Sequence, residues 1–316
     1  MSGSLIVYIA PKGFEKELLF ELRALGIVVL EQRERLFLCK RAADLNAQMI
    51  PAWAQNVWFE PEFIPAPSIN HVVKSLRARQ RNWACHPTMY FRRSLLIQEK
   101  LPKLKNDIPW EFGTPLPEIP PSRRLGAWTL WREDMVLASP VCSSCFADGE
   151  LLFRENKQDP PGRAYLKLWE ALTLLGKFPG AGDIALDLGS SPGGWTWVLA
   201  SLGAGVLSVD KAPLAENVAA MPGVEYMRGS AFGLCPYDFG QINWLCSDVI
   251  CYPERLFRLI MQWLEAGYSG NIICTLKFQG ATDFDCVNRF RNIPGGKLIH
   301  LFHNKHELTW LRPAFP

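Results

Sequence analysis

Residues 183–203 read DIALDLGSSPGGWTWVLASLG, an apolar strand that runs into a glycine-rich loop and then into a helix. In such a unit the glycines permit a tight turn and a close approach of ligand atoms, and the free N–H groups at the helix start face an anion. The spacing is G-x-x-x-G-G, which matches neither the dinucleotide pattern G-x-G-x-x-G nor a P-loop. The segment therefore predicts a nucleotide-like cofactor site that is not of either kind.

We expect the cofactor to be held by this loop and by two acidic residues. Asp187 comes just before the loop, where it can meet an amino group of the cofactor. Asp210 ends the next expected strand, about 20 residues beyond the loop, where a Rossmann-like site places its acceptor for ribose hydroxyls. The alternative is a purely structural strand–turn–helix, in which aromatic rings pack the helix on the sheet. The residues expected at the cofactor are Asp187, Gly189, Ser190, Ser191, Pro192, Gly193, Gly194, Trp195 and Asp210.

Candidate strands and helices alternate from about residue 156 to the C-terminus. This alternation is typical of an α/β domain with a mostly parallel sheet. It predicts a Rossmann-like domain over residues 156–316. Candidate strands are 184–188, 206–209, 224–227, 242–246, 271–276, 297–302 and 308–311, and candidate helices are 163–175, 195–202, 253–266 and 284–291.

The pattern of residues 1–155 differs and predicts a smaller α+β domain. A strand is expected at 4–10, a helix at 13–25 and one or two strands at 27–39, and strand-like alternation returns at 125–153. Two stretches dense in proline, 61–67 and 109–121, predict turns and extended pieces. The middle of this domain is therefore either a linker or an irregular fold.

Positive charge is concentrated in one part of the chain, although the net charge is only +3. Residues 71–124 carry a net charge of +7, so the remainder is net −4. Trp83, Tyr90, Phe91 and Trp110 are interleaved with these basic residues. Lysine and arginine release counterions from phosphates and aromatic rings stack on bases, so the stretch suits a polyanion such as RNA. The alternative is a basic face that is merely solvated.

The composition places the protein among two-domain cytoplasmic proteins. The chain has 316 residues, of which 48% are hydrophobic, and no apolar run approaches the roughly 20 residues that span a bilayer. The N-terminus lacks the basic region of a secretion signal, and we expect no membrane partner. Nine cysteines in apolar segments predict reduced thiols. Neither Cys142 and Cys145 nor the series His300, His303, His306 completes a metal site, so we expect no metal.

The loop D-L-G-x-x-P-G-G-[WF] resembles that of the FtsJ-like ribose 2'-O-methyltransferases, which use S-adenosylmethionine. The family carries a catalytic Lys-Asp-Lys-Glu tetrad, and all four positions are found here in the expected order. Lys167 lies on the helix before the first strand, and Asp248 ends the fourth strand. Lys277 ends the fifth strand, and Glu307 begins the last. The resemblance also implies that Asp248 lies near the cofactor.

The tetrad suits methyl transfer to a hydroxyl, because a hydroxyl is a poor nucleophile without an aligned proton acceptor. Lys277 is the candidate base and must then be neutral. The charge of Lys167 and partial burial favour the neutral form, whereas Asp248 and Glu307 oppose it. The resemblance implies that Asp248 orients Lys277, that Lys167 holds the ribose oxygen or a phosphate, and that Glu307 fixes the lysines.

Within this family the chain is most similar to the RlmM-like enzymes, which methylate a cytidine ribose of large-subunit ribosomal RNA. The similarity rests on LKLWEAL, SVDKAPL, NWLCSDV, IMQWLEAGY and HNKHELTW, and the N-terminal opening is also similar. It implies an RNA-binding, THUMP-like N-terminal region, which is short here. Ser230 stands where the family has an acid at the adenine, and Ala164 replaces a serine that helps the cofactor.

Three other interpretations remain open. In the first, the protein is the same kind of enzyme, but its RNA target is transfer RNA or a messenger cap instead of ribosomal RNA. The chain is an RNA-binding or ribosome assembly factor without catalysis, which the loss of the acid at Ser230 suggests and the intact tetrad opposes. An NAD-dependent oxidoreductase is the most distant alternative, because the glycine spacing differs.

Overall fold

The computed structural model describes residues 5–41, 50–104, 110–113 and 125–314, and the chain divides into two compact units. The N-terminal unit contains Met1–Trp110 and Pro117–Leu152. The C-terminal unit contains Glu111–Leu116 and Phe153–Pro316. The main division therefore falls between residues 152 and 153, close to the boundary expected after residue 155. Within the described ranges, no helix is long and apolar enough to cross a membrane.

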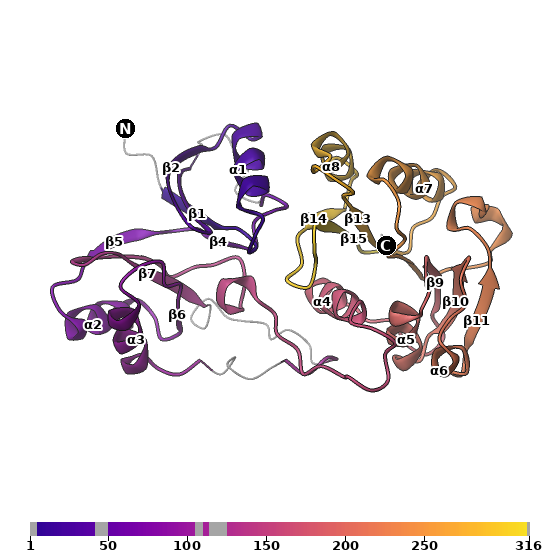
Figure 1. The fold of residues 1–316 in the computed structure, drawn as a ribbon, viewed down its shortest axis with the longest axis horizontal. Coiled ribbons are helices and arrows are strands. Elements are labelled where there is room, and N and C mark those ends of the chain that lie inside the picture. The colour runs from indigo at the N-terminus through magenta and orange to yellow at the C-terminus, as the bar shows by residue number, and fades with distance from the viewer. Residues whose placement is uncertain (1–4, 42–49, 105–109, 114–124, 315–316) are drawn as a thin grey trace. The chain divides into compact units, whose positions relative to one another are not determined.

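The C-terminal unit is built on a seven-stranded sheet with the order β11-β10-β9-β12-β13-β15-β14 (Figure 1). The first five strands in this order are parallel, and β15 is antiparallel to both of its neighbours. Chain order reverses between β9 and β12, and ligands of such sheets bind at this switch point, outside the carboxyl ends of the strands. The strands are β9 (Ile184–Leu188), β10 (Gly205–Asp210), β11 (Val224–Arg228), β12 (Trp244–Ser247), β13 (Asn271–Lys277), β14 (Lys297–Ile299) and β15 (Glu307–Arg312).

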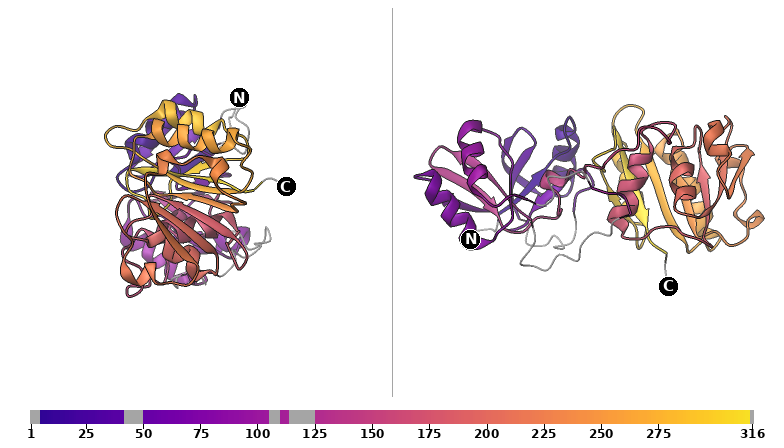
Figure 2. Two further views of the ribbon diagram at one scale, coloured as in Figure 1. Left: turned by 90° about the vertical axis from the view of Figure 1, so that its right-hand side faces the viewer. Right: turned by 90° about the horizontal axis from the view of Figure 1, so that it is seen from below.

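Helices cover both faces of this sheet (Figures 1 and 2). On one face α4 (Tyr165–Leu175) packs on α5 (Gly194–Ser201), and on the other α7 (Pro253–Glu265) packs on α8 (Phe284–Arg291). The short α6 (Glu216–Ala219) contacts β11. Helix α4 is apolar almost all round, and its residues from Tyr165 to Thr173 are all buried.

The predicted mostly parallel α/β fold is confirmed, with all seven expected strands present. One predicted strand, 297–302, is too long, because the structure ends β14 at Ile299. The backbone N–H groups of Phe302 and His303 leave the sheet and bind a side chain of α4 instead.

The N-terminal unit contains two four-stranded sheets, with orders β2-β3-β1-β4 and β5-β8-β7-β6. Apolar side chains of β1, β3 and β4 share one core with side chains of β7 and β8. The elements are β1 (Leu5–Ile9), α1 (Glu15–Ala24), β2 (Val28–Arg33), β3 (Leu36–Lys40), β4 (Asn56–Trp58), β5 (Glu62–Pro65), α2 (Ile69–Arg79), β6 (Trp83–Cys85), α3 (Phe91–Lys100), β7 (Gly126–Arg132) and β8 (Met135–Ser139).

The middle of this unit is regular, so the prediction of a linker or an irregular fold there was wrong. Helices α2 and α3 pack on the second sheet around Val72, Leu76 and Ile97. Both helices have an apolar face, which the proline-dense flanks obscured. Most of the second proline-dense stretch, 109–121, lies outside the described residues.

The aromatic residues of the basic stretch are only partly on the surface. Trp83 is fully buried, and its indole N–H donates to the carbonyls of Leu76 and Gln80, so the expectation that it stacks on bases was wrong. Tyr90 and Phe91 are 39% and 61% exposed at the start of α3. The exposed rings of the stretch therefore lie at the start of α3.

Candidate active site

The glycine-rich loop turns at the carboxyl end of β9 and leads into α5. Gly189 has φ +77°, and a Cβ built on it would lie 2.6 Å from Val249 Cα. Gly193 is the N-cap of α5 with φ +112°, and its Cβ would lie 2.9 Å from Val218 Cγ1. Side chains are excluded at both positions, because the backbone conformation is left-handed and the neighbours are too close.

A cavity of about 500 Å³ lies beside this loop. It is lined by Gly189, Ser191, Asp210, Ser230 and Asp248, all of which the sequence predicted. The remaining predicted contacts, Asp187, Ser190, Pro192, Gly193, Gly194 and Trp195, are not among the described lining residues. These residues turn the chain or pack beneath it.

Trp195 shows this packing role most directly. Its side chain is 2% exposed, and its indole N–H donates to the carbonyl of Ala164 over 3.0 Å. Ala164 is the N-cap of α4, so this bond ties the start of α4 to α5. Ala164, which stands where the family has a serine, thus contributes its backbone carbonyl to this hydrogen bond.

Asp187 is fully buried below the loop instead of facing the cavity. Its Oδ2 accepts a 2.6 Å hydrogen bond from Thr196 Oγ1, and Thr196 in turn contacts Ser208 Oγ over 2.7 Å. Burial raises the pKa of Asp187 to about 7, and the Thr196 hydrogen bond opposes this rise. The geometry gives Asp187 a place in holding α5 on the sheet, and a direct contact between Asp187 and the cofactor stays a prediction.

Asp210 stands on the cavity wall and also organises the loop. Its Oδ2 accepts from the backbone N–H of Ser191 and its Oδ1 from that of Ala212, each over 3.0 Å. Each carboxylate oxygen keeps a second lone pair, which is what two ribose hydroxyls require. A carboxylate at this position fits a nucleoside cofactor.

The wall around Ser230 contains residues that the sequence did not reveal. Ser230 Oγ accepts from the N–H of Phe232 over 3.3 Å and so caps a short 3₁₀ turn, Ala231–Gly233. The guanidinium of Arg255 lies 3.8 Å from the centre of the Phe232 ring, and both residues line the cavity. Ile250 completes this side. No spacing rule links a loop after β11 to the first turn of α7, so sequence patterns carried no signal.

The four predicted tetrad residues converge at the end of this cavity. Lys167 Nζ lies 2.7 Å from each carboxylate oxygen of Asp248 and 3.2 Å from Glu307 Oε1. Lys277 Nζ lies 3.2 Å from Asp248 Oδ1 and donates to the Asp248 carbonyl over 2.5 Å. The side chains of two lysines and two acids therefore meet in one nearly buried cluster.

The topology explains this convergence and divides the tetrad into two layers. Lys277 and Glu307 are paired in the antiparallel register of β13 and β15. Asp248 follows β12, the parallel neighbour of β13. Lys277 and Asp248 line the cavity, whereas Lys167 and Glu307 stand behind them, 7% and 6% exposed.

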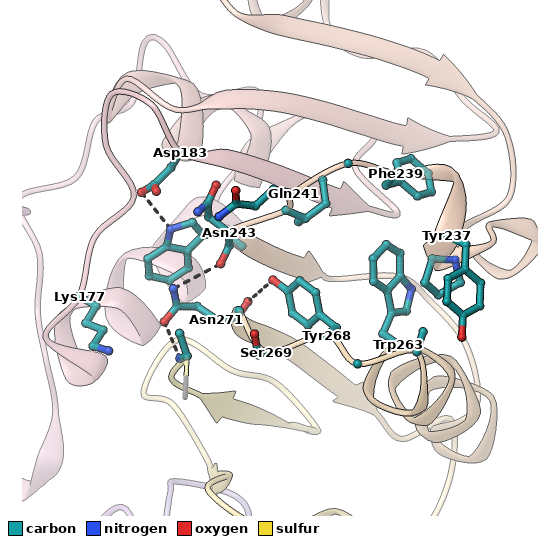
Figure 3. A pocket seen from close by; sticks show the side chains of 18 of the residues that line it. Lys177, Asp183, Tyr237, Phe239, Gln241, Asn243, Trp263, Tyr268, Ser269 and Asn271 are labelled. Carbon is teal, nitrogen blue, oxygen red and sulfur yellow. Dashed lines mark hydrogen bonds between the residues drawn. The ribbon is translucent and has the colours of Figure 1, made fainter. Parts of the chain in front are cut away.

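A larger cavity, about 760 Å³, lies at the opposite end of the strands, where β12 and β13 begin (Figure 3). Its wall includes Asp183, Asn243, Trp263, Tyr268 and Asn271. Hydrogen bonds tie several of these groups to one another and to nearby backbone, as the dashed lines in Figure 3 show. No tetrad or loop residue lies on the described part of this wall, so the smaller cavity is the candidate active site.

In the described ranges, no three or more His, Cys, Asp or Glu side chains are grouped so that they could hold a metal ion. Cys142 and Cys145 are both free thiols, and burial raises the pKa of each. His300 Nε2 contacts the Lys305 carbonyl, and His306 Nε2 contacts Thr282 Oγ1. The three histidines of the series thus have different hydrogen-bond partners, since His303 contacts Glu170.

A model of the FtsJ-like methyltransferase family matches residues 161–275. This segment of the chain is therefore similar to the FtsJ-like methyltransferases. The match contains the glycine-rich loop, Lys167 and Asp248, and it ends two residues before Lys277. Members of the family are S-adenosylmethionine-dependent methyltransferases. The cavity, the close-packed Gly189 and the Asp210 carboxylate fit this cofactor.

Individual relatives extend the similarity over different lengths. The chain is 36% identical to ribosomal RNA large subunit methyltransferase M of Halorhodospira halophila, over 48% of the chain and 47% of that relative. It is 29% identical to the protein of the same name from Xanthomonas euvesicatoria, over 98% of the chain and 99% of that relative. The chain thus spans about half the length of the first and nearly all of the second. A fibrillarin from Methanococcus jannaschii has a TM-score of 0.37 at 18% identity, over 47% of this chain and 74% of that one.

Proposed function

We propose that this protein transfers a methyl group from S-adenosylmethionine to a ribose 2'-hydroxyl of large-subunit ribosomal RNA. The observation that carries the proposal is the convergence of Lys167, Asp248, Lys277 and Glu307 at the end of the cofactor cavity. The names of relatives over half and over nearly all of the chain favour ribosomal RNA as the substrate. Because ribosomal RNA is the proposed substrate, we propose that the enzyme acts in the cytoplasm.

The residues of this site have separate tasks in the proposed reaction. Bound S-adenosylmethionine supplies an electrophilic methyl group. Lys277 Nζ, on the cavity wall and in its neutral amine form, accepts the proton of the ribose hydroxyl as that oxygen takes up the methyl group. The Asp248 carboxylate directs that Nζ. Lys167 and Glu307 hold Asp248 in place from behind, so the acceptor is aligned before the substrate arrives.

The N-terminal unit is the proposed RNA-binding domain, of a shortened THUMP-like kind. Tyr90 and Phe91, the N-cap and first residue of its α3, are exposed and are followed by Arg92 and Arg93. Exposed aromatic rings stack on unpaired bases, and the arginines next to them neutralise phosphates. This surface supports a single-stranded or looped segment of RNA as the binding partner.

The test is radiolabelled methyl transfer to total RNA from cells that lack this protein, with wild type compared with Lys277→Ala. Labelling by wild type alone, at a linkage that resists alkaline hydrolysis, is the expected result, and mapping then identifies the nucleotide. Labelling of transfer RNA or of capped messenger RNA would favour those substrates instead. If neither protein labels RNA or ribosomal precursors while wild type binds S-adenosylhomocysteine, the protein is a non-catalytic RNA-binding factor.

A further inference from the structure

A second carboxylate of helix α4 holds the loop that leads to Glu307. Glu170 lies one turn beyond Lys167 on the same helix and is 2% exposed. Its Oε1 accepts from the backbone N–H of Phe302 over 2.8 Å, and its Oε2 accepts from that of His303 over 3.0 Å. His303 Nδ1 lies 2.7 Å from the same Oε2. Three donors of one loop therefore converge on a single buried carboxylate.

The loop continues from this anchor to the tetrad through a short run of hydrogen bonds. Asn304 Nδ2 donates to the carbonyl of Glu307 over 3.3 Å and to Thr309 Oγ1 over 3.1 Å. The N–H of Lys305 donates to Glu307 Oε1 over 3.3 Å, the same oxygen that faces Lys167. The position of the Glu307 carboxylate thus depends on the path of residues 302–305.

We propose that Glu170 is a positioning residue for methyl transfer, which holds Glu307 against Lys167 through the loop 302–305. This inference rests on the proposed function. Helix α4 carries both ends of the arrangement, since Lys167 contacts Glu307 directly and Glu170 fixes the loop that presents it. A displacement of about 1 Å at a reacting group can cost about 100-fold in rate, which makes such an anchor consequential.

Glu170→Gln is the informative variant because it keeps the size of the side chain. A carboxylate accepts all three N–H groups, whereas an amide has one acceptor oxygen and turns its own N–H groups toward at least one donor. The loop must then shift. Glu21→Gln is the matched control: Glu21 is 1% exposed on α1 of the other unit and accepts from the backbone N–H groups of Ala52 and Trp53.

The experiment measures single-turnover methyl transfer, S-adenosylhomocysteine affinity and thermal unfolding of the full chain. We expect Glu170→Gln to lower the rate at least tenfold with cofactor affinity unchanged within twofold, and Glu21→Gln to leave the rate within twofold. In a Glu307→Gln background, Glu170→Gln should add less than a twofold loss, because the group that it positions is already gone.

Three outcomes would overturn the inference: an unaffected rate, an equal loss in both backgrounds, or a parallel loss of cofactor affinity. If Glu307→Gln is too slow to measure, the pH–rate profile of Glu170→Gln decides, since a displaced Glu307 changes the apparent pKa of the profile and a merely structural loss does not. Absence of transfer by wild type would instead refute the proposed function.

Discussion

Lys167 donates to both carboxylate oxygens of Asp248 at 2.7 Å, and its ammonium group also faces Glu307 at 3.2 Å. A single cation therefore contacts two nearly buried acids, one that follows β12 and one that begins β15. This relationship makes Lys167 the centre of the cluster, although Lys277 is the lysine that lines the cavity.

Lys167→Met should abolish most methyl transfer and destabilise the C-terminal unit. Removing one partner of a buried ion pair leaves its charge uncompensated, at a cost of about 3–5 kcal/mol. We expect at least a 100-fold lower single-turnover rate. Lys177→Met, at an exposed lysine on the opposite edge of the sheet, is the control and should retain wild-type activity. Full activity in Lys167→Met would contradict the proposed arrangement.

Gly189→Ala should remove cofactor binding. The new Cβ would meet Val249 Cα at 2.6 Å in a left-handed conformation, so the loop must move away from Asp248. Isothermal titration with S-adenosylhomocysteine should show at least a tenfold weaker affinity. Gly180→Ala adds a Cβ with nothing within 4 Å and should bind as wild type does. Equal affinities of the two variants would argue against this loop as the cofactor site.

Asp187→Asn should change how stability depends on pH. The folded chain holds the Asp187 proton up to a pKa of about 7, whereas the unfolded chain releases it near 3.8. The free energy of unfolding therefore falls as pH rises from about 4 to 7, by a contribution on the order of 4 kcal/mol. Asparagine has no such proton. Thermal unfolding across this range should show wild type losing stability relative to the variant, and parallel curves would show that Asp187 is ionised throughout.

Ser230→Asp should tighten cofactor binding. Aspartate caps a helical turn as serine does, so the hydrogen bond from the Phe232 N–H is kept. The added carboxylate faces the cavity and accepts a charge-assisted hydrogen bond from an adenine amino group, which we expect to raise affinity about threefold to tenfold. Ser191→Asp, on the loop side of the same cavity, is the comparison and should not bind more tightly. Weaker binding by Ser230→Asp would place the adenine elsewhere.

Phe91→Ala and Arg92→Ala should weaken RNA binding in different ways. Loss of the ring removes stacking, worth about 1–3 kcal/mol per base, without changing the salt dependence of binding. Loss of the arginine reduces the slope of affinity against salt by about one phosphate contact. Filter binding at several salt concentrations distinguishes the two. Tyr237→Ala, at a 78% exposed ring of the other unit, is the control, and an equal loss there would contradict a specific α3 surface.

Much of the C-terminal unit could be predicted because its signals are local. Strand and helix periods are set by neighbouring residues, and the seven strands were found from them. The helices α2 and α3 were not predicted, because the segment that contains them is flanked by proline-dense stretches, which indicate turns and extended pieces. For Asp187 the sequence showed an acid beside a glycine loop, but whether it faces the cavity depends on how α5 packs.

By itself, the sequence determined the succession of strands and helices along the chain and the glycine loop, and its resemblance to a family singled out the four tetrad residues. The tertiary structure alone decided which of these residues line the cavity. It also decided that Arg255 stacks on Phe232 and that Glu170 accepts hydrogen bonds from a loop 133 positions away. The physical reason is that hydrogen bonds and burial between distant segments depend on the packing of whole elements. Local periodicity carries no record of that packing.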